Sequence, residues 1–283
     1  MSTTSRLAGF VAALVVLFGG AALAGAAIGP ERDDASTEPE EHSEMTATHE
    51  ETGAAHPVRG LAVAEDGLRV VVDDPELRRG RAETLRFRIV DDHGETVRHF
   101  DVEHEKRMHL ILARRDLTGF QHLHPEQGDD GTWTTTVRLD EAGSYRLFAD
   151  FSRAGEPYTP ATDLRVDGAA DLRPLPEPEP TAVSDGGYDV RLDAGEARPG
   201  EEADLRFTIT KDGVPVRTEP YLGAGGHLVA LREGDMAFLH VHPTADDSVQ
   251  FAATFPTEGR YRLFLQFKHE GRVQTVAFTQ AVS

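Results

Sequence analysis

Short apolar segments separated by turn residues recur from about residue 60 to the end of the chain. In the first half they are rich in β-branched and aromatic residues, which favour strands, and Gly, Asp and Pro lie between them. Beyond the N-terminus, no stretch keeps the helical period of about 3.6 residues. The pattern therefore predicts an all-β body with few helices. The expected strands of the first half are Leu68–Val72, Glu83–Val90, Met108–Ala113, Phe120–His124, Thr132–Leu139 and Tyr145–Phe151.

The two halves of the chain repeat the same landmarks in the same order. In each half a His-Leu pair is followed, thirteen residues after its histidine, by a His-x-His-Pro segment, and later by a Gly-x-Tyr-Arg-Leu-Phe segment. Between these landmarks the spacing changes only once, by two residues. Such a repeat indicates a tandem duplication. The landmarks are His109-Leu110, His122–Pro125 and Gly143–Phe148 in the first half, and His227-Leu228, His240–Pro243 and Gly259–Phe264 in the second.

Each half is expected to form one β-sandwich. A tyrosine follows a short connection in both halves, at Tyr145 and Tyr261. This arrangement resembles the tyrosine corner of Greek-key sandwiches, in which the hydroxyl bonds back to the preceding connection. We therefore predict two tandem immunoglobulin-like or cupredoxin-like Greek-key β-sandwiches, at residues 59–167 and 188–283, after one N-terminal hydrophobic helix.

The N-terminal residues indicate the compartment. Arg6 is the only charged residue before an uncharged run from Leu7 to Ile28. A run of about 20 apolar residues can span a bilayer as a helix, and a short apolar core with small residues after it also fits a secretory signal. We predict that residues 1–28 are a signal peptide or a membrane anchor. In both cases the rest of the chain is expected outside the cytoplasm, anchored in the cell membrane or secreted.

Residues 29–58 are predicted to be a disordered acidic stalk, because they carry many acids and little that could be buried. They include Met45 and the histidines His42, His49 and His56, which occur every seven residues. Imidazole and thioether groups are both copper ligands, so this segment is either a metal-scavenging tail or a solvated spacer with incidental histidines.

A second spacer is expected at residues 168–187. Four prolines alternate with other residues between Pro174 and Pro180, a pattern typical of extended polyproline II. We predict that this segment is a semi-rigid linker that separates the two domains.

Charge and cysteine content exclude several functions. The chain has 49 acidic and 29 basic side chains, a formal net charge of -20, and it offers no cluster of cations for nucleic acid. It has no cysteine. Disulfides, thiolate nucleophiles, cysteine-based zinc sites, iron–sulfur clusters and a blue-copper thiolate are therefore all excluded.

The histidines of the repeated landmarks are candidate metal ligands. If the strands around Ile111 and His122 form a hairpin in which residue i faces residue 233 − i, His109 lies opposite His124. His122 and His124 share one face of their strand, because side chains alternate. Three imidazoles then converge, as a metal site with three histidine ligands requires. We predict one such triad per domain, with Cu(II) or Zn(II) as the metal and the ligands His109, His122, His124, His227, His240 and His242.

Other readings of these histidines remain open at this stage. A strand-borne His-x-His can be a solvent-facing pair or a hydrogen-bonded part of a core, and Pro125 and Pro243 could mark strand ends. Further candidate ligands in the first half are Asp101, Glu103 and His104, in the segment that precedes His109. In the second half, residues 221–226 have Tyr, Leu, Gly and Ala instead, so such a ligand would belong to the first domain alone.

The motif Met-His-Leu followed by Phe-x-His-x-His-Pro at residues 108–125, and its counterpart at residues 223–243, resemble segments of secreted or membrane-tethered bacterial β-sandwich proteins. Some of these are YtkA-like or heavy-metal-associated proteins. The resemblance covers both predicted domains, and it implies an extracytoplasmic, cupredoxin-like β-sandwich with a link to copper. It implies no single-electron blue-copper chemistry, because the cupredoxin cysteine is absent.

Three functions follow from these residues. The first is extracytoplasmic metal binding, for copper or zinc homeostasis or delivery, with the metal ion as partner and the membrane contacted through an uncleaved N-terminal helix. The second is a membrane-tethered structural or adhesive pair of sandwiches without metal. The third is a hydrolase or oxidase with an open three-histidine site. No carboxylate lies at the same offset from the triad in both halves, so we do not expect an enzyme.

Overall fold

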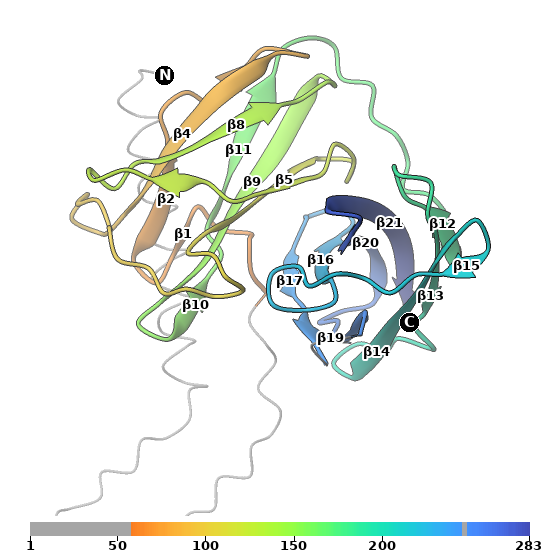
Figure 1. Ribbon diagram of the computed structural model, residues 1–283. Coiled ribbons are helices and arrows are strands. Elements are labelled where there is room, and N and C mark those ends of the chain that lie inside the picture. The colour runs from red at the N-terminus through yellow and green to blue at the C-terminus, as the bar shows by residue number, and fades with distance from the viewer. Residues whose placement is uncertain (1–57, 245–247) are drawn as a thin grey trace, which may run out of the picture. The chain divides into compact units, whose positions relative to one another are not determined.

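A computed structural model describes residues 58–244 and 248–283 of the chain, and these residues form strands and turns without any helix. Figure 1 shows the strands, which form four sheets. This confirms the predicted all-β class with two repeated domains. The predicted N-terminal helix and acidic stalk, with Met45 and the histidines of the stalk, lie outside the described residues. Within the described ranges, nothing forms a helix that could cross a membrane.

The first sandwich consists of two sheets. One has the order β1-β2-β4-β8-β7, and the other has the order β3-β11-β9-β5-β6, with β10 paired to β9. The strands of the first sheet are β1 (Ala64–Glu65), β2 (Leu68–Val72), β4 (Ala82–Val90), β8 (Trp133–Arg138) and β7 (Glu126–Gln127). Those of the second are β3 (Glu76–Leu77), β11 (Ala161–Val166), β9 (Gly143–Arg153), β5 (His109–Arg114), β6 (Gln121–Leu123) and β10 (Glu156–Tyr158).

The second sandwich repeats this arrangement. Its sheets have the orders β12-β13-β14-β19-β18, with β15 paired to β14, and β17-β16-β20-β21. The strands of the first of these sheets are β12 (Thr181–Val183), β13 (Asp189–Asp193), β14 (Glu202–Lys211), β19 (Gln250–Thr254), β18 (His242–Pro243) and β15 (Val214–Pro215). Those of the other are β17 (Phe238–His240), β16 (His227–Arg232), β20 (Gly259–His269) and β21 (Arg272–Val282).

The order of the main strands is the same in both copies, as a duplication requires. The copies differ at the margins. β10 and β11 of the first copy correspond to the single strand β21, and β15 has only a bridge between Val90 and Thr96 as its counterpart. The parallel pairing of β3 with β11 is reduced in the second copy to a parallel bridge between Ala197 and Val282.

The tyrosine corners are also present in both copies. Tyr145 donates a hydrogen bond to the carbonyl oxygen of Glu141, and Tyr261 donates one to that of Thr257, each at 3.0 Å. These bonds confirm the corner predicted from the sequence.

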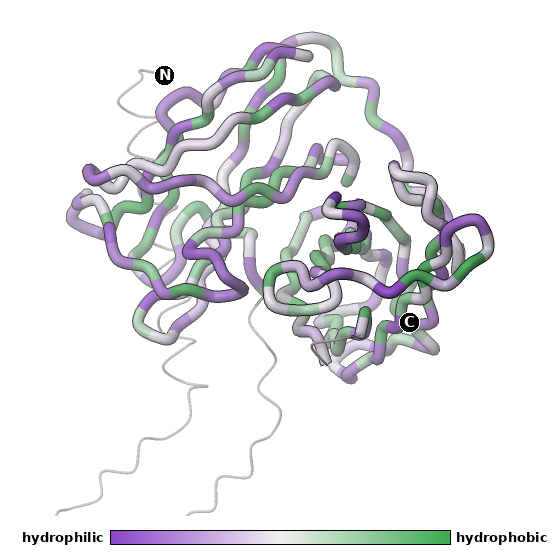
Figure 2. The backbone as a smooth tube through the Cα atoms, viewed as in Figure 1, coloured by the Kyte–Doolittle hydropathy of each residue, from purple (hydrophilic) through white to green (hydrophobic). Residues whose placement is uncertain are grey.

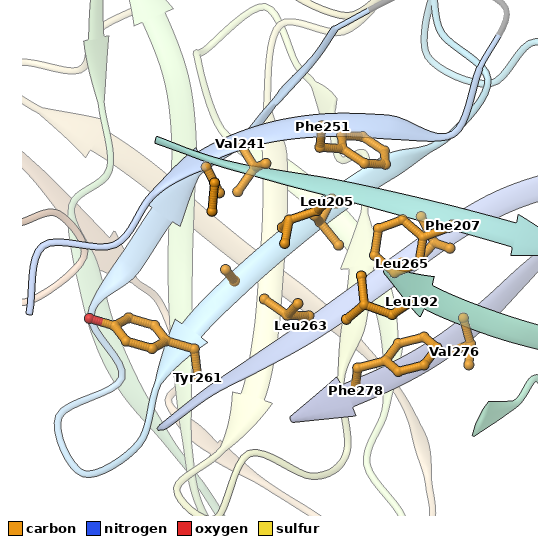
Figure 3. Close-up of a cluster of buried hydrophobic side chains, with 14 of the residues drawn as sticks. Leu192, Leu205, Phe207, Val241, Phe251, Tyr261, Leu263, Leu265, Val276 and Phe278 are labelled. Atoms are coloured by element: carbon orange, nitrogen blue, oxygen red, sulfur yellow. The ribbon is translucent and has the colours of Figure 1, made fainter. Parts of the chain in front are cut away.

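Each sandwich has its own apolar core, built by strands whose side chains alternate between inside and outside. Along β14, every second residue from Ala203 to Ile209 is buried. Figure 2 shows hydrophilic residues at many of the turns between strands. The core of the second sandwich contains Phe207, Phe251 and Phe278 among its largest members (Figure 3). In the first sandwich, Trp133 has a comparable central position.

A third apolar cluster joins the two sandwiches. It contains Ile111 and Phe148 of the first copy with Val229, Phe238 and other residues of the second. β5 is buried along its whole length, and β16 is buried over its central four residues. In both strands, therefore, the side chains that point away from the sandwich core are also buried, and these side chains contribute to the cluster. Buried apolar area of this kind is the main source of stability for an interface.

The contacts in this cluster are reciprocal. Phe120 of the first copy stacks on Phe264 of the second, with ring centroids 4.0 Å apart. Their counterparts in the other copy, Phe238 and Phe148, also meet, at 5.6 Å. The two copies therefore contact each other through equivalent surfaces, as the subunits of a two-fold symmetric dimer do.

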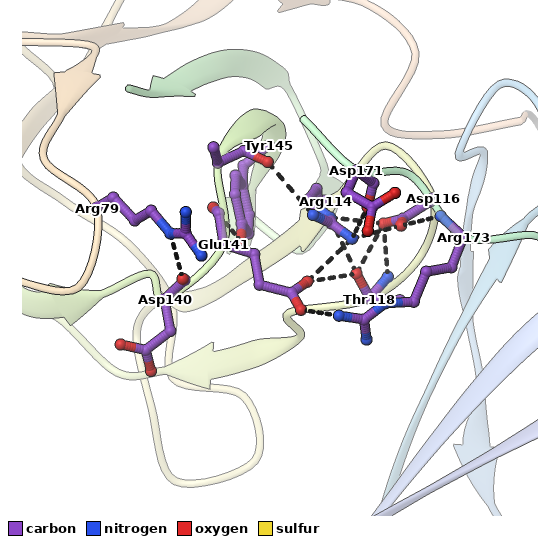
Figure 4. A network of polar contacts seen from close by, with 10 residues as sticks. Arg79, Arg114, Asp116, Thr118, Asp140, Glu141, Tyr145, Asp171 and Arg173 are labelled. Atoms are coloured by element: carbon purple, nitrogen blue, oxygen red, sulfur yellow. Dashed lines mark hydrogen bonds and ion pairs between the residues drawn. The ribbon is translucent and has the colours of Figure 1, made fainter. Parts of the chain in front are cut away.

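The proline pattern predicted a linker that separates the two domains. In the structure, the linker also packs against them. Leu175 is 7% exposed and lies in the cluster between the sandwiches. Arg114 is buried and makes an ion pair with Asp116, and it also donates a hydrogen bond to the backbone oxygen of Asp171 (Figure 4). Arg173 of the linker pairs with Glu141. Because leaving a buried guanidinium without partners is costly, these contacts tie the linker to the first sandwich.

Candidate metal centre

The β5–β6 hairpin brings the predicted ligands of the first domain together. Its register pairs Ile111 with His122 and Leu110 with Leu123, which is the predicted register. The ring centroids of His109, His122 and His124 lie 4.8 to 5.2 Å from one another. Three imidazoles on one tetrahedral ion have ring centroids roughly 5 Å apart when each metal–nitrogen distance is about 2.0–2.1 Å. The ring spacing within this domain is thus of the right size for a shared ion, but the group of ligand nitrogens that converge contains His109 and His122 and not His124.

His227 of the second domain joins this group. Its ring is parallel to that of His109 within 6°, with centroids 5.5 Å apart, and its centroid lies 4.9 Å from that of His122. Ligand nitrogens of His109, His122 and His227 all lie within 4.8 Å of one another. The sequence prediction placed His227 in a separate site of the second domain. The structure differs because β5 and β16 both contribute to the cluster between the sandwiches, and each strand begins with its histidine.

The other two predicted ligands lie on short strands of the second copy. His240 ends β17 and His242 begins β18. The pairing of His240 with Val229 is equivalent to that of His122 with Ile111, so the hairpin register is the same in both copies. The side chains of both residues lie outside what the structure describes.

Hydrogen bonds orient the two buried rings. Nδ1 of His122 lies 2.8 Å from Oε1 of Gln266, whose amide nitrogen donates to Thr275 at 3.2 Å. Nε2 of His109 lies 3.2 Å from the backbone oxygen of Glu103. Both partners are acceptors, so each of these outer nitrogens carries the ring proton. The inner nitrogens, Nδ1 of His109 and Nε2 of His122, face each other at 3.0 Å. With the amide of Gln266 oriented in this way, both nitrogens present lone pairs, an arrangement that a shared cation would stabilise.

A proton is disfavoured in that position. Burial, together with the neighbouring His109 and His124, lowers the pKa of His122 to about 3. Burial, His109 and Lys106 lower the pKa of His124 to about 4. Both rings are therefore neutral at pH 7, which is the form that binds metals. Nε2 of His124 is also buried without a hydrogen-bond partner among the described residues.

Of the additional candidates in the first domain, one lies beside the cluster through its side chain. The ring of His104 is 6.1 Å from that of His109 and 5.6 Å from that of His227. Glu103 contributes its backbone oxygen, while its side chain is exposed. Asp101 accepts a hydrogen bond from the backbone nitrogen of Gly155.

Two residues of the site were not identified from the sequence. Gln266 lies opposite His227 in the β16–β20 ladder and reaches the first domain. Asp150 occupies the equivalent place opposite His109, is 8% exposed, and accepts a hydrogen bond from Thr159 at 2.9 Å. The sequence does carry a signal that the two histidine strands are buried on both faces. In each strand the histidine is followed by a continuous apolar run, Leu-Ile-Leu-Ala after His109 and Leu-Val-Ala-Leu after His227, and such runs are typical of strands buried on both faces.

The donor set fits a borderline transition-metal ion. It offers imidazoles and no thiolate, and the outer nitrogens of two rings donate to carbonyl oxygens, as metal-bound histidines usually do. Nitrogens bound to one tetrahedral ion lie roughly 3.3 Å apart for metal–nitrogen distances of about 2.0–2.1 Å. The 3.0 Å between the facing nitrogens of His109 and His122 is close to this value.

No curated protein matches the sequence. Among solved structures, the chain is similar to the Escherichia coli adhesin FdeC, with 16% identity over 78% of this chain and 66% of that one and a TM-score of 0.28. It is also similar to Salmonella alpha-2-macroglobulin reacted with methylamine (14% identity, 81% of this chain, 15% of that one, TM-score 0.29). A third likeness is to InvD of Yersinia pseudotuberculosis (11% identity, 77% and 57%, TM-score 0.27).

The chain thus spans 66% or less of the length of each of these three proteins, and TM-scores this low carry no argument about function. One family model matches residues 62–168 and again residues 181–283, so it covers each sandwich once. The chain therefore belongs to the family described as a domain of unknown function, DUF8832.

Proposed function

We propose that the protein binds one Cu(II) or Zn(II) ion through His109, His122 and His227, at the junction of its two sandwiches. The observation that carries this proposal is the pair of facing nitrogens on His109 and His122, whose outer nitrogens both contact oxygen acceptors. A metal ion between them satisfies both lone pairs, and a nitrogen of His227 lies within 4.8 Å of each. The ring of His124 also lies beside this group, 5.1 Å from that of His109.

Copper(II) is the first choice of metal. For a site of given geometry with nitrogen donors, the order of stability places Cu(II) above Zn(II), and both accept three imidazoles. The location that fits this role is outside the cytoplasm, as the uncharged run from Leu7 to Ile28 after Arg6 predicts. The role itself is metal homeostasis or delivery rather than catalysis.

Metal analysis of the full-length protein tests the proposal. The wild type, purified without added metal, is titrated with Cu(II) and Zn(II) against a chelator of known affinity. The double variant His109→Ala/His227→Ala should bind at least about 100-fold more weakly, because two of three ligands are gone. The matched control is His93→Ala/His99→Ala, which removes two exposed histidines outside the cluster and should bind as the wild type does.

His227→Asn, a milder change at a half-buried position, serves as a second variant if the double variant does not fold. Equal affinity of this variant, or of the folded double variant, and the wild type would refute the proposed site.

A second candidate function is a structural or adhesive pair of sandwiches, in which the histidines only hold the domains together. The hydrogen bond from His122 to Gln266 favours it, since it joins the two copies without any metal. In that case the melting temperature would not respond to copper, zinc or chelator, while His122→Ala would still destabilise the fold.

A further inference from the structure

The segment before β5 forms a tight turn with an unusual backbone. Glu103 and Lys106 pair with each other, and the two residues between them, His104 and Glu105, have φ values of 46° and 65°. Turns with two left-handed residues normally use Gly or Asn, because a side chain there costs roughly 1–2 kcal/mol per residue. Backbone strain of this kind often marks a functional position.

The second copy has the same turn with different residues. Tyr221 pairs with Ala224, and between them lie Leu222 and Gly223, with φ values of 55° and 81°. Leu222 is buried, whereas its counterpart His104 is only half-buried. The duplicated turn therefore accepts leucine at this position, and a histidine is not needed to form it.

In the first copy the turn contributes twice to the histidine cluster. The backbone oxygen of Glu103 contacts Nε2 of His109 at 3.2 Å. The ring of His104 lies nearly perpendicular to the parallel rings of His109 and His227, at 78° and 76°. The strained backbone thus holds an additional imidazole next to two of the three proposed ligands.

Four of the described histidine rings form two triangles with a common edge. His109, His227 and His122 make the inner triangle, with centroid distances of 4.9 to 5.5 Å. His109, His227 and His104 make the outer triangle, with distances of 5.5 to 6.1 Å. The nitrogens that lie within 4.8 Å of one another are those of the inner triangle. An ion held by the outer triangle would need to exchange one ligand, His104 for His122, to reach it.

Exposure gives this exchange a direction. Both triangles share His109, which is 4% exposed, and His227, which is half-buried, so they differ only in their third ring. That ring is His122, 9% exposed, in the inner triangle and the half-buried His104 in the outer one. The exposed residues around His104 are three carboxylates, Asp101, Glu103 and Glu105, and two cations, Lys106 and Arg107, so the local charge is negative by one. The outer triangle is therefore the more accessible of the two.

We propose that His104 is a loading ligand, which captures a Cu(II) or Zn(II) ion from solvent with His109 and His227 and passes it to the inner triangle. This inference depends on the proposed metal site. It concerns the rate of loading, and it leaves the final coordination of the ion to the inner histidines.

The test variant is His104→Leu, since the second copy has leucine at the same place in the same turn. Full-length wild type and variant are freed of metal, mixed rapidly with Cu(II) chloride, and followed by the absorption of the bound ion. We expect the association rate to fall at least about tenfold, while the equilibrium affinity changes less than about threefold. The control His93→Leu removes an exposed histidine of the turn at 91–95 and should load as the wild type does. The stalk histidines are present in all three proteins and contribute equally.

Two results would overturn the loading role without touching the metal site. One is an unchanged association rate in His104→Leu, and the other is a loss of affinity as large as that of His109→Ala, which would make His104 a permanent ligand. A wild type that binds no metal would instead refute the proposed function, and the loading role with it.

Discussion

At the residue scale, the site depends on which nitrogen of each ring carries the proton. Gln266 has this role for His122, because its amide oxygen accepts from Nδ1 and leaves Nε2 to face His109. Thr275 in turn fixes the amide, since it accepts from the amide nitrogen. If His122 binds the proposed ion, Gln266 is an oriented outer partner, and such partners affect affinity although they do not touch the ion.

Replacing Gln266 tests this orientation. Gln266→Leu removes the acceptor, and we expect Cu(II) or Zn(II) affinity to fall roughly 10- to 100-fold. Gln266→Glu is the matched control, because a carboxylate still accepts from Nδ1 and should preserve binding. Competition titrations against a chelator measure both. Equal losses in the two variants would show that packing at this position matters and hydrogen bonding does not.

The same buried rings predict how stability responds to acid in protein freed of metal. The folded-state pKa of His122 is about 3 and that of His124 about 4, both below the unfolded value of about 6.5. Between these pH values the unfolded chain binds more protons at these two residues than the folded chain does. Their contribution to the free energy of unfolding is therefore fully present above pH 6.5 and is lost as the pH falls toward 4.

Lowering the pH from 7.5 to 5 should reduce the free energy of unfolding by about 2 kcal/mol through His122. The reduction through His124 should be smaller, because that side chain is partly exposed. Urea unfolding at the two pH values measures this loss. In His122→Gln/His124→Gln, which has no imidazole at these positions, most of the pH dependence should disappear. A loss of the same size in the variant would assign the acid sensitivity to other groups.

At the scale of elements, local pattern predicted much of what is observed. Residue alternation and turn positions predicted the strands, the duplication and the register of Ile111 with His122, because a hairpin register depends on nearby residues. The tyrosine corners at Tyr145 and Tyr261 were predictable for the same reason. The position of His227 next to His109 could not be predicted in this way, because it depends on how β5 packs against β16. Packing between sheets that are far apart in the sequence depends on the shapes of their surfaces, which the local hydrophobic pattern does not give.

At the scale of the whole described structure, the apolar cluster between the sandwiches determines whether the histidines meet. Phe120 and Phe264 stack at 4.0 Å, and neither is among the proposed ligands. Loosening this contact should separate His227 from His109 and His122. Metal affinity and the stability of the contact between the sandwiches are therefore expected to be coupled, because β5 and β16 contribute residues to both.

Phe264→Leu tests that coupling. It should destabilise the protein by about 1 kcal/mol and also weaken metal binding several-fold, measured by urea unfolding and by competition titration. The matched control is Phe278→Leu, in the core of the second sandwich (Figure 3), which should cost similar stability without changing the affinity of folded protein. Equal affinities of the two variants would indicate that the site tolerates movement between the domains.

The reciprocal contacts between the copies have a consequence for how such a site can evolve. In a dimer of two identical chains, every substitution occurs in both subunits. A substitution that improves one position of the site is therefore also present at the symmetry-related position, where it can be unfavourable. Joining the copies in one polypeptide removes that constraint. Asp150 here faces His109 where Gln266 faces His227, and His104 occupies the turn position that Leu222 fills in the other half. Two equivalent domains in one chain can therefore carry different residues around the same histidine cluster.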